Sequence, residues 1–355
     1  MIPVTLITGF LGSGKTTLLN HLLRQPALAD AAVIINEFGE VGIDHLLVSA
    51  PAENMVLLDT GCLCCTVRGD LIETLTDLHR KRESGTVPPF SHLIIETTGL
   101  ADPVPVLQTV VAEETLQGVY RLHDVVTLVD ALHGDAQLDS NPESVKQAAV
   151  ADALLLTKTD LAPRESVDAL RLRLSRINPG AELHEVVRGV IAPAVFLHGN
   201  LYEPRTKAPE VERWLNTAAH AHHEHAHDVN RHDERIRAYC LYHDKPIRRG
   251  GLMMWLDMLA GLKGANLLRV KGVLNVEGDA VVVHAVQTVV HEPLVLDAWP
   301  GDDRRSRLVF ITRDMAREEI ERTFDAFDFA PAPVRKGPID ATAYAQFVEA
   351  MKGFR

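Results

Sequence analysis

Short runs of apolar residues recur along the first half of the chain, and segments with helical spacing separate them. The runs span residues 2–8, 32–36, 55–58, 92–95, 123–130, 153–157 and 183–187. Few polar residues interrupt these runs, which is typical of strands that are buried on both faces. Strands of this kind alternate with helices in α/β proteins. The pattern therefore predicts an α/β domain with a mostly parallel sheet and helices on both faces.

The pattern changes in the second half of the chain. Two strand-like runs, "RIRAYCLY" and "RLVFI", enclose a helical segment, "PIRRGGLMMWLDMLAGL", and further strands that extend to Trp299, and the helical segment "MAREEIERTFDAF" follows. This order predicts a smaller α+β domain with helices on one face of an antiparallel sheet, in which Cys240 is a core residue. The expected divisions are a first domain at 1–217, a His-rich linker at 218–232, a second domain at 233–330 and a tail at 331–355.

Composition narrows the class of protein. A chain of 355 residues is long enough for two domains. The net charge of -12 disfavours nonspecific binding to nucleic acid or to an anionic membrane. No apolar run is long enough to span a bilayer, and the start "MIPVTLITGF" lacks the basic region of a signal peptide. Four cysteines fit a reducing compartment. We therefore expect a cytoplasmic protein without a nucleic-acid or membrane partner.

The first apolar run leads into "GFLGSGKTT", and a helical segment follows. Glycines allow the backbone to wrap closely around a polyphosphate, and the helix N-terminus adds positive potential. In this motif the lysine reaches the β- and γ-phosphates and the hydroxyl ligates Mg²⁺. The alternative is a glycine-rich turn without a ligand. The expected nucleotide contacts are Gly9, Gly12, Ser13, Gly14, Lys15, Thr16 and Thr17.

A second motif, "TKTD", ends the apolar run at 153–157. The carboxylate of Asp160 can accept two N–H donors from guanine, which adenine does not offer, and the stem of Lys158 would lie along the base. Ligands of open α/β sheets bind at such strand ends. Thr157 stands where the usual pattern has asparagine, so guanine preference is expected on the strength of Asp160. A solvated surface Lys-x-Asp is the alternative.

A third motif, "ETTGLADP", ends the run at 92–95. Glu96 at this strand end is placed to hold Mg²⁺ or its water, and Gly99 offers a backbone N–H to a γ-phosphate. A loop of this kind moves when that phosphate leaves. The alternative is a strand followed by a helix-capping threonine and a turn.

In this order, "GFLGSGKTT", "INEFGEVGID", "GCLCC", "ETTGLADP" and "TKTD" resemble the CobW-like GTPases, a metallochaperone branch of the P-loop proteins. The second domain resembles that family more loosely. The resemblance implies GTP hydrolysis to GDP, coupled to delivery of zinc or cobalt to a client metalloprotein. Lys15 would stabilise charge on the γ-phosphate, and Thr16 and Glu96 would hold Mg²⁺. Arg68 is the one, weak, candidate for an arginine finger.

Three of the four cysteines, Cys62, Cys64 and Cys65, lie in "GCLCC". Thiolates are soft ligands that suit Zn²⁺, Co²⁺ or Cu(I), and three of them leave a fourth position open for a handover ligand. The resemblance adds Glu37 as a further ligand and Glu40 as a weaker one. If a nucleotide-sensing segment supplies one of the ligands, the affinity for the metal would depend on the nucleotide state. Inert buried cysteines and a redox pair are the alternatives.

A histidine-rich run, "HAHHEHAHDVNRH", lies between the two expected domains. Histidine binds zinc, cobalt, nickel and copper with little selectivity, so this run is a candidate metal buffer, or else a solvated linker. It also supports a rival function, a metal-storage or metal-sensing protein in which the nucleotide acts as a switch. A small-molecule kinase is a remote third. The sequence does not determine the metal, the client or the oligomeric state, and a homo-oligomer is compatible with it.

Overall fold

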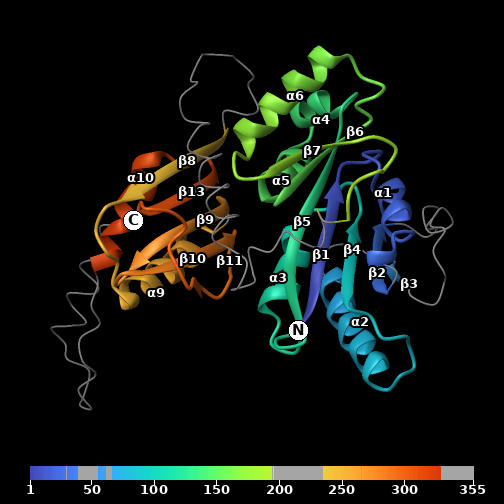
Figure 1. The fold of residues 1–355 in the computed structure, drawn as a ribbon, viewed down its shortest axis with the longest axis horizontal. Coiled ribbons are helices and arrows are strands. Elements are labelled where there is room, and N and C mark those ends of the chain that lie inside the picture. Colours follow the sequence, from blue (N-terminus) through green and yellow to red (C-terminus); the bar gives the residue numbers. More distant parts are fainter. Residues whose placement is uncertain are drawn as a thin grey trace.

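The computed structural model of the chain describes residues 1–28, 30–38, 55–60, 66–193, 195, 235–264 and 266–328. At 36–38, 55–60, 66–68 and 262–263 it describes the backbone alone. These residues form two β-sheets, and Figure 1 shows them side by side, with helices between them. The larger sheet belongs to the N-terminal half of the chain and the smaller one to the C-terminal half.

The larger sheet is parallel throughout, with the strand order β3-β2-β4-β1-β5-β6-β7. Its strands are β1 (Ile2–Gly9), β2 (Ala31–Phe38), β3 (Met55–Thr60), β4 (His92–Thr97), β5 (Tyr120–Asp130), β6 (Ala153–Thr157) and β7 (Glu182–Val186). Every apolar run predicted from the sequence overlaps one of these strands. All six residues of β4 are buried, because the sheet is covered on both faces. The predicted fold class is confirmed.

Helices cover the two faces unequally. The helices are α1 (Lys15–Leu22), α2 (Thr66–Glu83), α3 (Val104–Ala112), α4 (Gly134–Ser140), α5 (Pro142–Val150) and α6 (Arg164–Ile177), with a 3₁₀ turn at Pro26–Leu28. Leucines of α1 pack on one face, and α2, α3, α5 and α6 pack on the other. In α6 the buried residues Val167, Leu170, Leu174 and Ile177 recur at helical spacing, so a single apolar stripe meets the sheet.

The smaller sheet is antiparallel, with the order β11-β10-β9-β13-β8 and β12 paired to β10. Its strands are β8 (Ile236–His243), β9 (Leu267–Val276), β10 (Asp279–Val286), β11 (Val289–Val290), β12 (Leu294–Val295) and β13 (Ser306–Arg313). Helix α9 (Arg249–Met258), which continues as a π turn at Leu259–Lys263, packs on one face together with α10 (Arg317–Glu321). The predicted α+β unit is therefore confirmed, and Cys240 in β8 is buried as expected.

The last predicted helix is shorter than the pattern suggests. Helix α10 ends at Glu321, and a 3₁₀ segment continues to Asp328. In that segment the Thr323 hydroxyl donates to the carbonyl oxygen of Ile320 at 2.6 Å and accepts the indole N–H of Trp255 at 2.8 Å. Phe327 packs against the same indole ring. The tighter turn is selected by this packing on Trp255, which a local pattern does not reveal.

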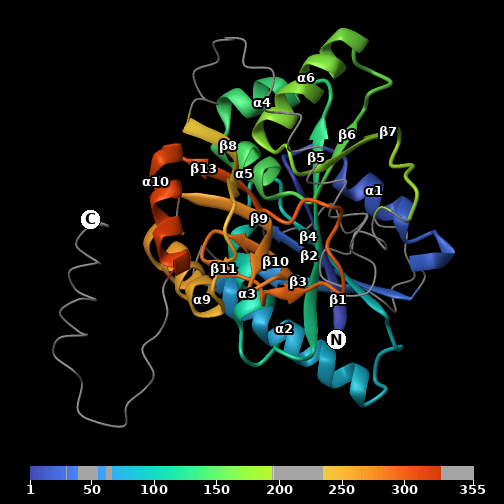
Figure 2. The same cartoon turned by 60° about the vertical axis from the view of Figure 1, so that its left-hand side comes forward.

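The two units share an interface on the helical face of the larger sheet. Val286 of β10 belongs to the same apolar core as α3, and Leu268 and Ile311 belong to the same core as α5 and α6. The turned view in Figure 2 brings the smaller sheet in front of α3 and α5. Helices α3 and α5 therefore lie between the two sheets.

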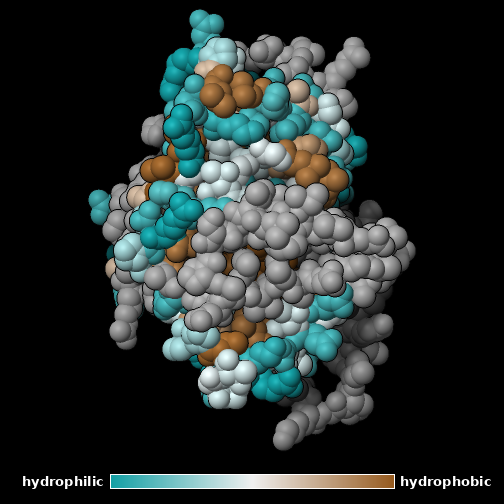
Figure 3. Space-filling model, turned by 90° about the vertical axis from the view of Figure 1, so that its right-hand side faces the viewer, coloured by the Kyte–Doolittle hydropathy of each residue, from teal (hydrophilic) through white to brown (hydrophobic). Residues whose placement is uncertain are grey.

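No helix in the described part of the chain is long and apolar enough to cross a membrane. On the face drawn in Figure 3, the apolar side chains of the described residues form separate patches between polar ones. Patches of this kind are ordinary on a protein surface.

Candidate nucleotide site

Strand β1 ends in a glycine-containing loop that begins in close contact with β5. Gly9 has a φ of 139°, and a Cβ there would lie 2.4 Å from the carbonyl oxygen of Leu128. Only glycine fits this position. Gly14 is the N-cap of α1, so the loop leads directly into a helix N-terminus. Strand, loop and helix follow in the order that a phosphate-binding loop requires.

Lys15 is the first residue of α1, and its side chain is buried. Its ammonium group donates to the carbonyl oxygens of Gly9 and Phe10, at 2.9 and 3.3 Å. The ammonium group therefore lies against the backbone at the start of the loop. Thr16, the next residue, is half-buried at the same helix end, where the backbone dipole favours negative charge.

The end of β4 lies beside this loop, because β4 and β1 are neighbouring strands. Glu96 is buried and lies opposite Ile7 in the parallel register. The Thr97 hydroxyl donates to the Thr8 hydroxyl at 2.9 Å. A Cβ on Gly99 would lie 2.5 Å from the backbone nitrogen of Leu11, so the loop after β4 touches the phosphate-binding loop. The structure brings Lys15, Thr16, Glu96 and Gly99 to one edge of the sheet.

Lys158 joins the "TKTD" motif to the same edge. It adopts a left-handed backbone conformation, with a φ of 57°, and its ammonium group donates to the carbonyl oxygen of Gly12 at 2.7 Å. The same group pairs with the carboxylate of Asp130 at 2.7 Å. Asp130 is 1% exposed and also accepts the backbone N–H of Leu132. Asp160 lies exposed two residues after Lys158. Asp130 thus fixes the direction of the lysine stem.

The hydroxyl of Thr157 points to the phosphate-binding loop. It donates to the carbonyl oxygen of Ser13 at 2.7 Å and lies 3.4 Å from the carbonyl oxygen of Val129. Threonine therefore ties the end of β6 to the loop. Thr157 stands in place of the usual asparagine, and its hydrogen bonds do not involve the carboxylate of Asp160.

Replacing Thr157 with valine is expected to weaken the binding of GTP and GDP alike, by about tenfold, because the buried carbonyl oxygen of Ser13 loses its partner. Discrimination between guanine and adenine nucleotides should not change. Titration with fluorescent GTP, GDP and ATP analogues measures both quantities. Thr157→Ser, which keeps the hydroxyl, should bind like the wild type. A loss of guanine preference in Thr157→Val would show that this side chain reads the base.

The predicted metal ligands lie outside what the structure describes. Cys62, Cys64, Cys65 and Glu40 are not among the described residues, nor is the histidine-rich run at 220–232, and Glu37 in β2 is described by its backbone alone. Arg68 lies in α2, which begins at Thr66, and only its backbone is described. Among the described side chains, no group of three or more His, Cys, Asp or Glu residues could hold a metal ion.

Two residues at this edge were not predicted from the sequence. Asp130 ends the apolar run at 123–130, and an acidic residue at a strand end was the available signal. Gln147 contacts the loop after β4 from α5, and its helical context gave no such signal.

Comparison with known families covers both units. The profile of the CobW/HypB/UreG nucleotide-binding domain matches residues 3–185, and that of the cobalamin synthesis protein CobW C-terminal domain matches residues 236–328. The first match includes every described residue of the phosphate-binding loop, of "ETTG" and of "TKTD".

Curated relatives extend over most of the chain. The zinc chaperone YjiA of Escherichia coli is 34% identical over 325 residues, which cover 91% of this chain and 98% of that protein. The zinc chaperone CobW of a Sinorhizobium species is 30% identical over 347 residues, which cover 87% of this chain and 92% of that protein. The zinc-regulated GTPase metalloprotein activator 1 of Schizosaccharomyces pombe is 35% identical over 195 residues, 53% of this chain and 46% of that protein.

A solved structure shows the same arrangement of both units. The crystal structure of Zn(II)-bound YjiA GTPase from E. coli aligns with a TM-score of 0.68 and 29% identity, and the alignment covers 92% of this chain and 99% of that one. With the family profile matching more than half of the chain, and with the phosphate-binding loop in place, the protein belongs to the CobW/HypB/UreG family of P-loop GTPases.

Proposed function

We propose that this protein is a GTP-dependent zinc chaperone that transfers its metal to a client metalloprotein. The observation that carries the proposal is the combination of a complete phosphate-binding edge with similarity to a zinc chaperone over 98% of that relative's length. A relative of the nucleotide domain is named a zinc-regulated GTPase metalloprotein activator, which supports a client metalloprotein as the partner.

The geometry of the edge supports the nucleotide roles that we assign to its residues. Lys15 neutralises charge on the β- and γ-phosphates, and Asp160 accepts the N–H donors of guanine. Thr16 and Glu96 would hold Mg²⁺, because a hydroxyl in the first turn of α1 and a buried carboxylate on β4, the neighbour of β1, are the hard oxygen donors that this ion prefers. When bound, Mg²⁺ would supply positive charge that neutralises the phosphates during hydrolysis. The Gly99 N–H would donate to the γ-phosphate, and the close approach of Gly99 to Leu11 of the phosphate-binding loop supports this role.

We assign binding of the transferred metal to the cysteine motif. Cys62, Cys64 and Cys65 supply three thiolates and Glu37 a carboxylate, a donor set that suits Zn²⁺ and also accommodates Co²⁺. Residue 37 lies on β2 and Asp59 pairs opposite to it on β3, and the cysteine motif follows β3, so the strand that carries Glu37 and the strand before the cysteines are neighbours in the nucleotide-binding sheet. Ligands attached to this sheet would shift with the nucleotide state, and zinc affinity would shift with them.

The test is a Zn²⁺ titration of the full chain with a GTP analogue, with GDP and without nucleotide. In the wild type we expect the tightest zinc affinity to differ about tenfold or more between the analogue and GDP. Cys64→Ala combined with Cys65→Ala should remove both the tight site and this difference, because thiolates are the strongest donors in the set. The Co²⁺ titration, run in parallel, decides whether cobalt is also carried.

The control comes from the histidine-rich run. The E. coli relative was solved with Zn(II) bound even in a variant in which one glutamate and two cysteines are alanine, so zinc occupancy alone is not diagnostic in that protein. A variant with alanine at His222, His223 and His225 should keep the nucleotide-dependent tight site and lose weak ions only. If affinity ignores both the nucleotide and the cysteines while several weak ions bind, zinc storage is the function and delivery is wrong.

A further inference from the structure

Helix α5 connects the loop after β4 to the C-terminal domain. We propose that Gln147 on α5 is a positioning residue that sets the Gly99–Asp102 loop for contact with the γ-phosphate, and that the C-terminal domain acts on GTP binding and turnover through this helix. The proposal depends on nucleotide binding alone and is independent of which metal the protein carries.

The contact between α5 and the loop is made by one buried side chain. Gln147 is 1% exposed, and its amide nitrogen donates to the carbonyl oxygens of Gly99 and Ala101 at 3.2 and 3.0 Å. Its own backbone carbonyl accepts the hydroxyl of Thr127 on β5 at 2.7 Å. Gln147 is therefore fixed to the sheet on one side and holds the loop on the other. The loop in turn lies against the phosphate-binding loop at Leu11.

A second contact supports the first. The ammonium group of Lys146 pairs with the carboxylate of Asp102 at 2.5 Å, and this carboxylate also accepts the backbone N–H of Val104, where α3 begins. The loop is thus held between α5 and α3. Helix α3 itself reaches the C-terminal domain, since Gln108 donates to the hydroxyl of Thr288 at 2.8 Å.

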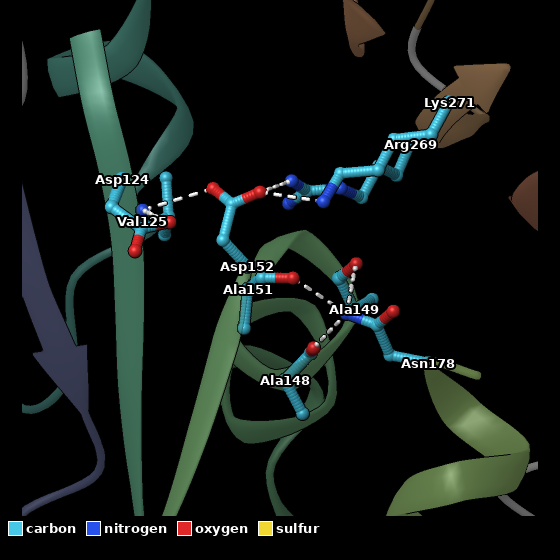
Figure 4. A network of polar contacts seen from close by, with 9 residues as sticks. All are labelled: Asp124, Val125, Ala148, Ala149, Ala151, Asp152, Asn178, Arg269 and Lys271. Carbon is cyan, nitrogen blue, oxygen red and sulfur yellow. Dashed lines mark hydrogen bonds and ion pairs between the residues drawn. The ribbon is translucent and has the colours of Figure 1, made fainter. Parts of the chain in front are cut away.

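The C-terminal end of α5 is joined to the C-terminal domain by buried charges. Asp152 follows the helix and is 7% exposed, and its carboxylate contacts Arg269 and Lys271 of β9, which are 2% and 6% exposed (Figure 4). The distance to the Lys271 ammonium group is 2.6 Å. The second oxygen of the carboxylate accepts the backbone N–H of Val125 at 3.0 Å. This carboxylate therefore joins β5, the end of α5 and β9.

Asn178 makes the end of α5 rigid. Its amide donates to the carbonyl oxygens of Ala148, Ala149 and Ala151 at 2.9, 3.1 and 2.9 Å, as Figure 4 shows. These are carbonyl groups that a helix C-terminus leaves without intrahelical partners. A short helix that is fixed in this way moves as one body.

Coupling follows from the cost of separating buried polar groups. If the Gly99–Asp102 loop moves when the γ-phosphate binds or leaves, it must either break the hydrogen bonds of Gln147 or move α5. Moving α5 displaces Asp152 relative to Arg269 and Lys271, and a buried charge cannot lose its partner cheaply. If GTP in place of GDP changes the affinity for a partner that repositions β9, then that partner changes the preference for GTP over GDP by the same factor.

The first test uses the unmodified protein. Backbone hydrogen exchange of α5 and β9 is measured with a non-hydrolysable GTP analogue and with GDP. We expect the exchange rates of β9 amides to differ between the two states by severalfold, although β9 lies in the other domain. Identical exchange in α5 and β9 in both states would overturn the proposal.

The second test isolates Gln147. Gln147→Met keeps the length of the side chain and removes the donor, and Gln117→Met makes the same change at an exposed position after α3. In Gln147→Met we expect the affinity ratio of GTP analogue to GDP to fall about tenfold, KM for GTP to rise and kcat to fall, and the β9 exchange difference to disappear. Gln117→Met should match the wild type. A purely structural role would weaken both nucleotides equally, and an unchanged ratio would refute the positioning role.

Discussion

Replacing Asp152 with alanine is expected to lower the free energy of unfolding by about 3–5 kcal/mol, the usual cost of removing one partner of a buried ion pair. Arg269 and Lys271 would be left as buried cations at the domain interface without the carboxylate that both of them contact. Burial by itself would raise the pKa of Asp152, but the charges of Arg269 and Lys271 outweigh it and hold this pKa below the usual range. Its contribution to stability is therefore present above about pH 4 and is lost as the pH falls through the lower, folded-state pKa.

Asp124 provides the matched comparison, because it behaves in the opposite way. It lies beside Asp152 (Figure 4) and is also buried, and burial together with the neighbouring carboxylate raises its pKa well above the usual range. The folded state keeps a proton on Asp124 that the unfolded state loses, so this residue costs stability as the pH rises above about 4. Asparagine imitates the protonated acid. Asp124→Asn should therefore be neutral or stabilising at pH 7.

Urea denaturation of both variants at about pH 5 and about pH 7 measures these effects. The advantage of Asp124→Asn over the wild type should be larger at pH 7 than at pH 5, whereas Asp152→Ala should be destabilised at both. Both pH values lie below the pKa of Lys271, which burial and the like charge of Arg269 lower to about 8, so Lys271 stays charged in the wild type. If Asp124→Asn becomes less stable relative to the wild type as the pH rises, Asp124 is the ionised partner and the two roles are reversed.

Replacing Lys15 with alanine is expected to reduce the rate of GTP hydrolysis about 100- to 1,000-fold, the cost of removing one preorganised group that stabilises transition-state charge. The helix itself should tolerate the change, because alanine is the best helix former and Lys15 is the first residue of α1. GTP hydrolysis by enzymes of this class is slow without an activating partner, of order 10⁻⁴ to 10⁻² per second. Phosphate release under single-turnover conditions, followed over hours, is the appropriate measurement.

Two controls separate chemistry from folding in this experiment. Lys81→Ala makes the same change on the exposed face of α2, where Lys81 pairs with Asp77, and should leave hydrolysis unchanged. Lys15→Ala loses the hydrogen bonds to Gly9 and Phe10, and it should still unfold in one cooperative transition well above the assay temperature. Hydrolysis by Lys15→Ala at a rate near that of the wild type would show that another cation neutralises the γ-phosphate, and the assignment of this loop would then need revision.

The sequence by itself determined the parallel sheet and the phosphate-binding loop. Each strand of the larger sheet is buried on both faces, so its residues form an apolar run that is legible without any tertiary information. Gly9, Gly14 and Lys15 are equally local, since the loop closes within one strand–loop–helix unit. The family resemblance rests on the same local motifs, and comparison with known families bears it out.

Tertiary structure alone decided how the two units are connected. Gln147 lies in α5, Asp152 in the connection that follows it and Arg269 in β9, and no pattern along the chain indicates that they link the loop after β4 to the second domain. The role of Thr157 was also decided in space, because its partner, Ser13, lies 144 residues away. Local patterns report which face of an element is apolar, whereas partners of buried polar groups depend on which elements the fold brings together. For that reason the motifs at the nucleotide-binding edge were recognisable in the sequence, and the contacts that connect them to the second domain were not.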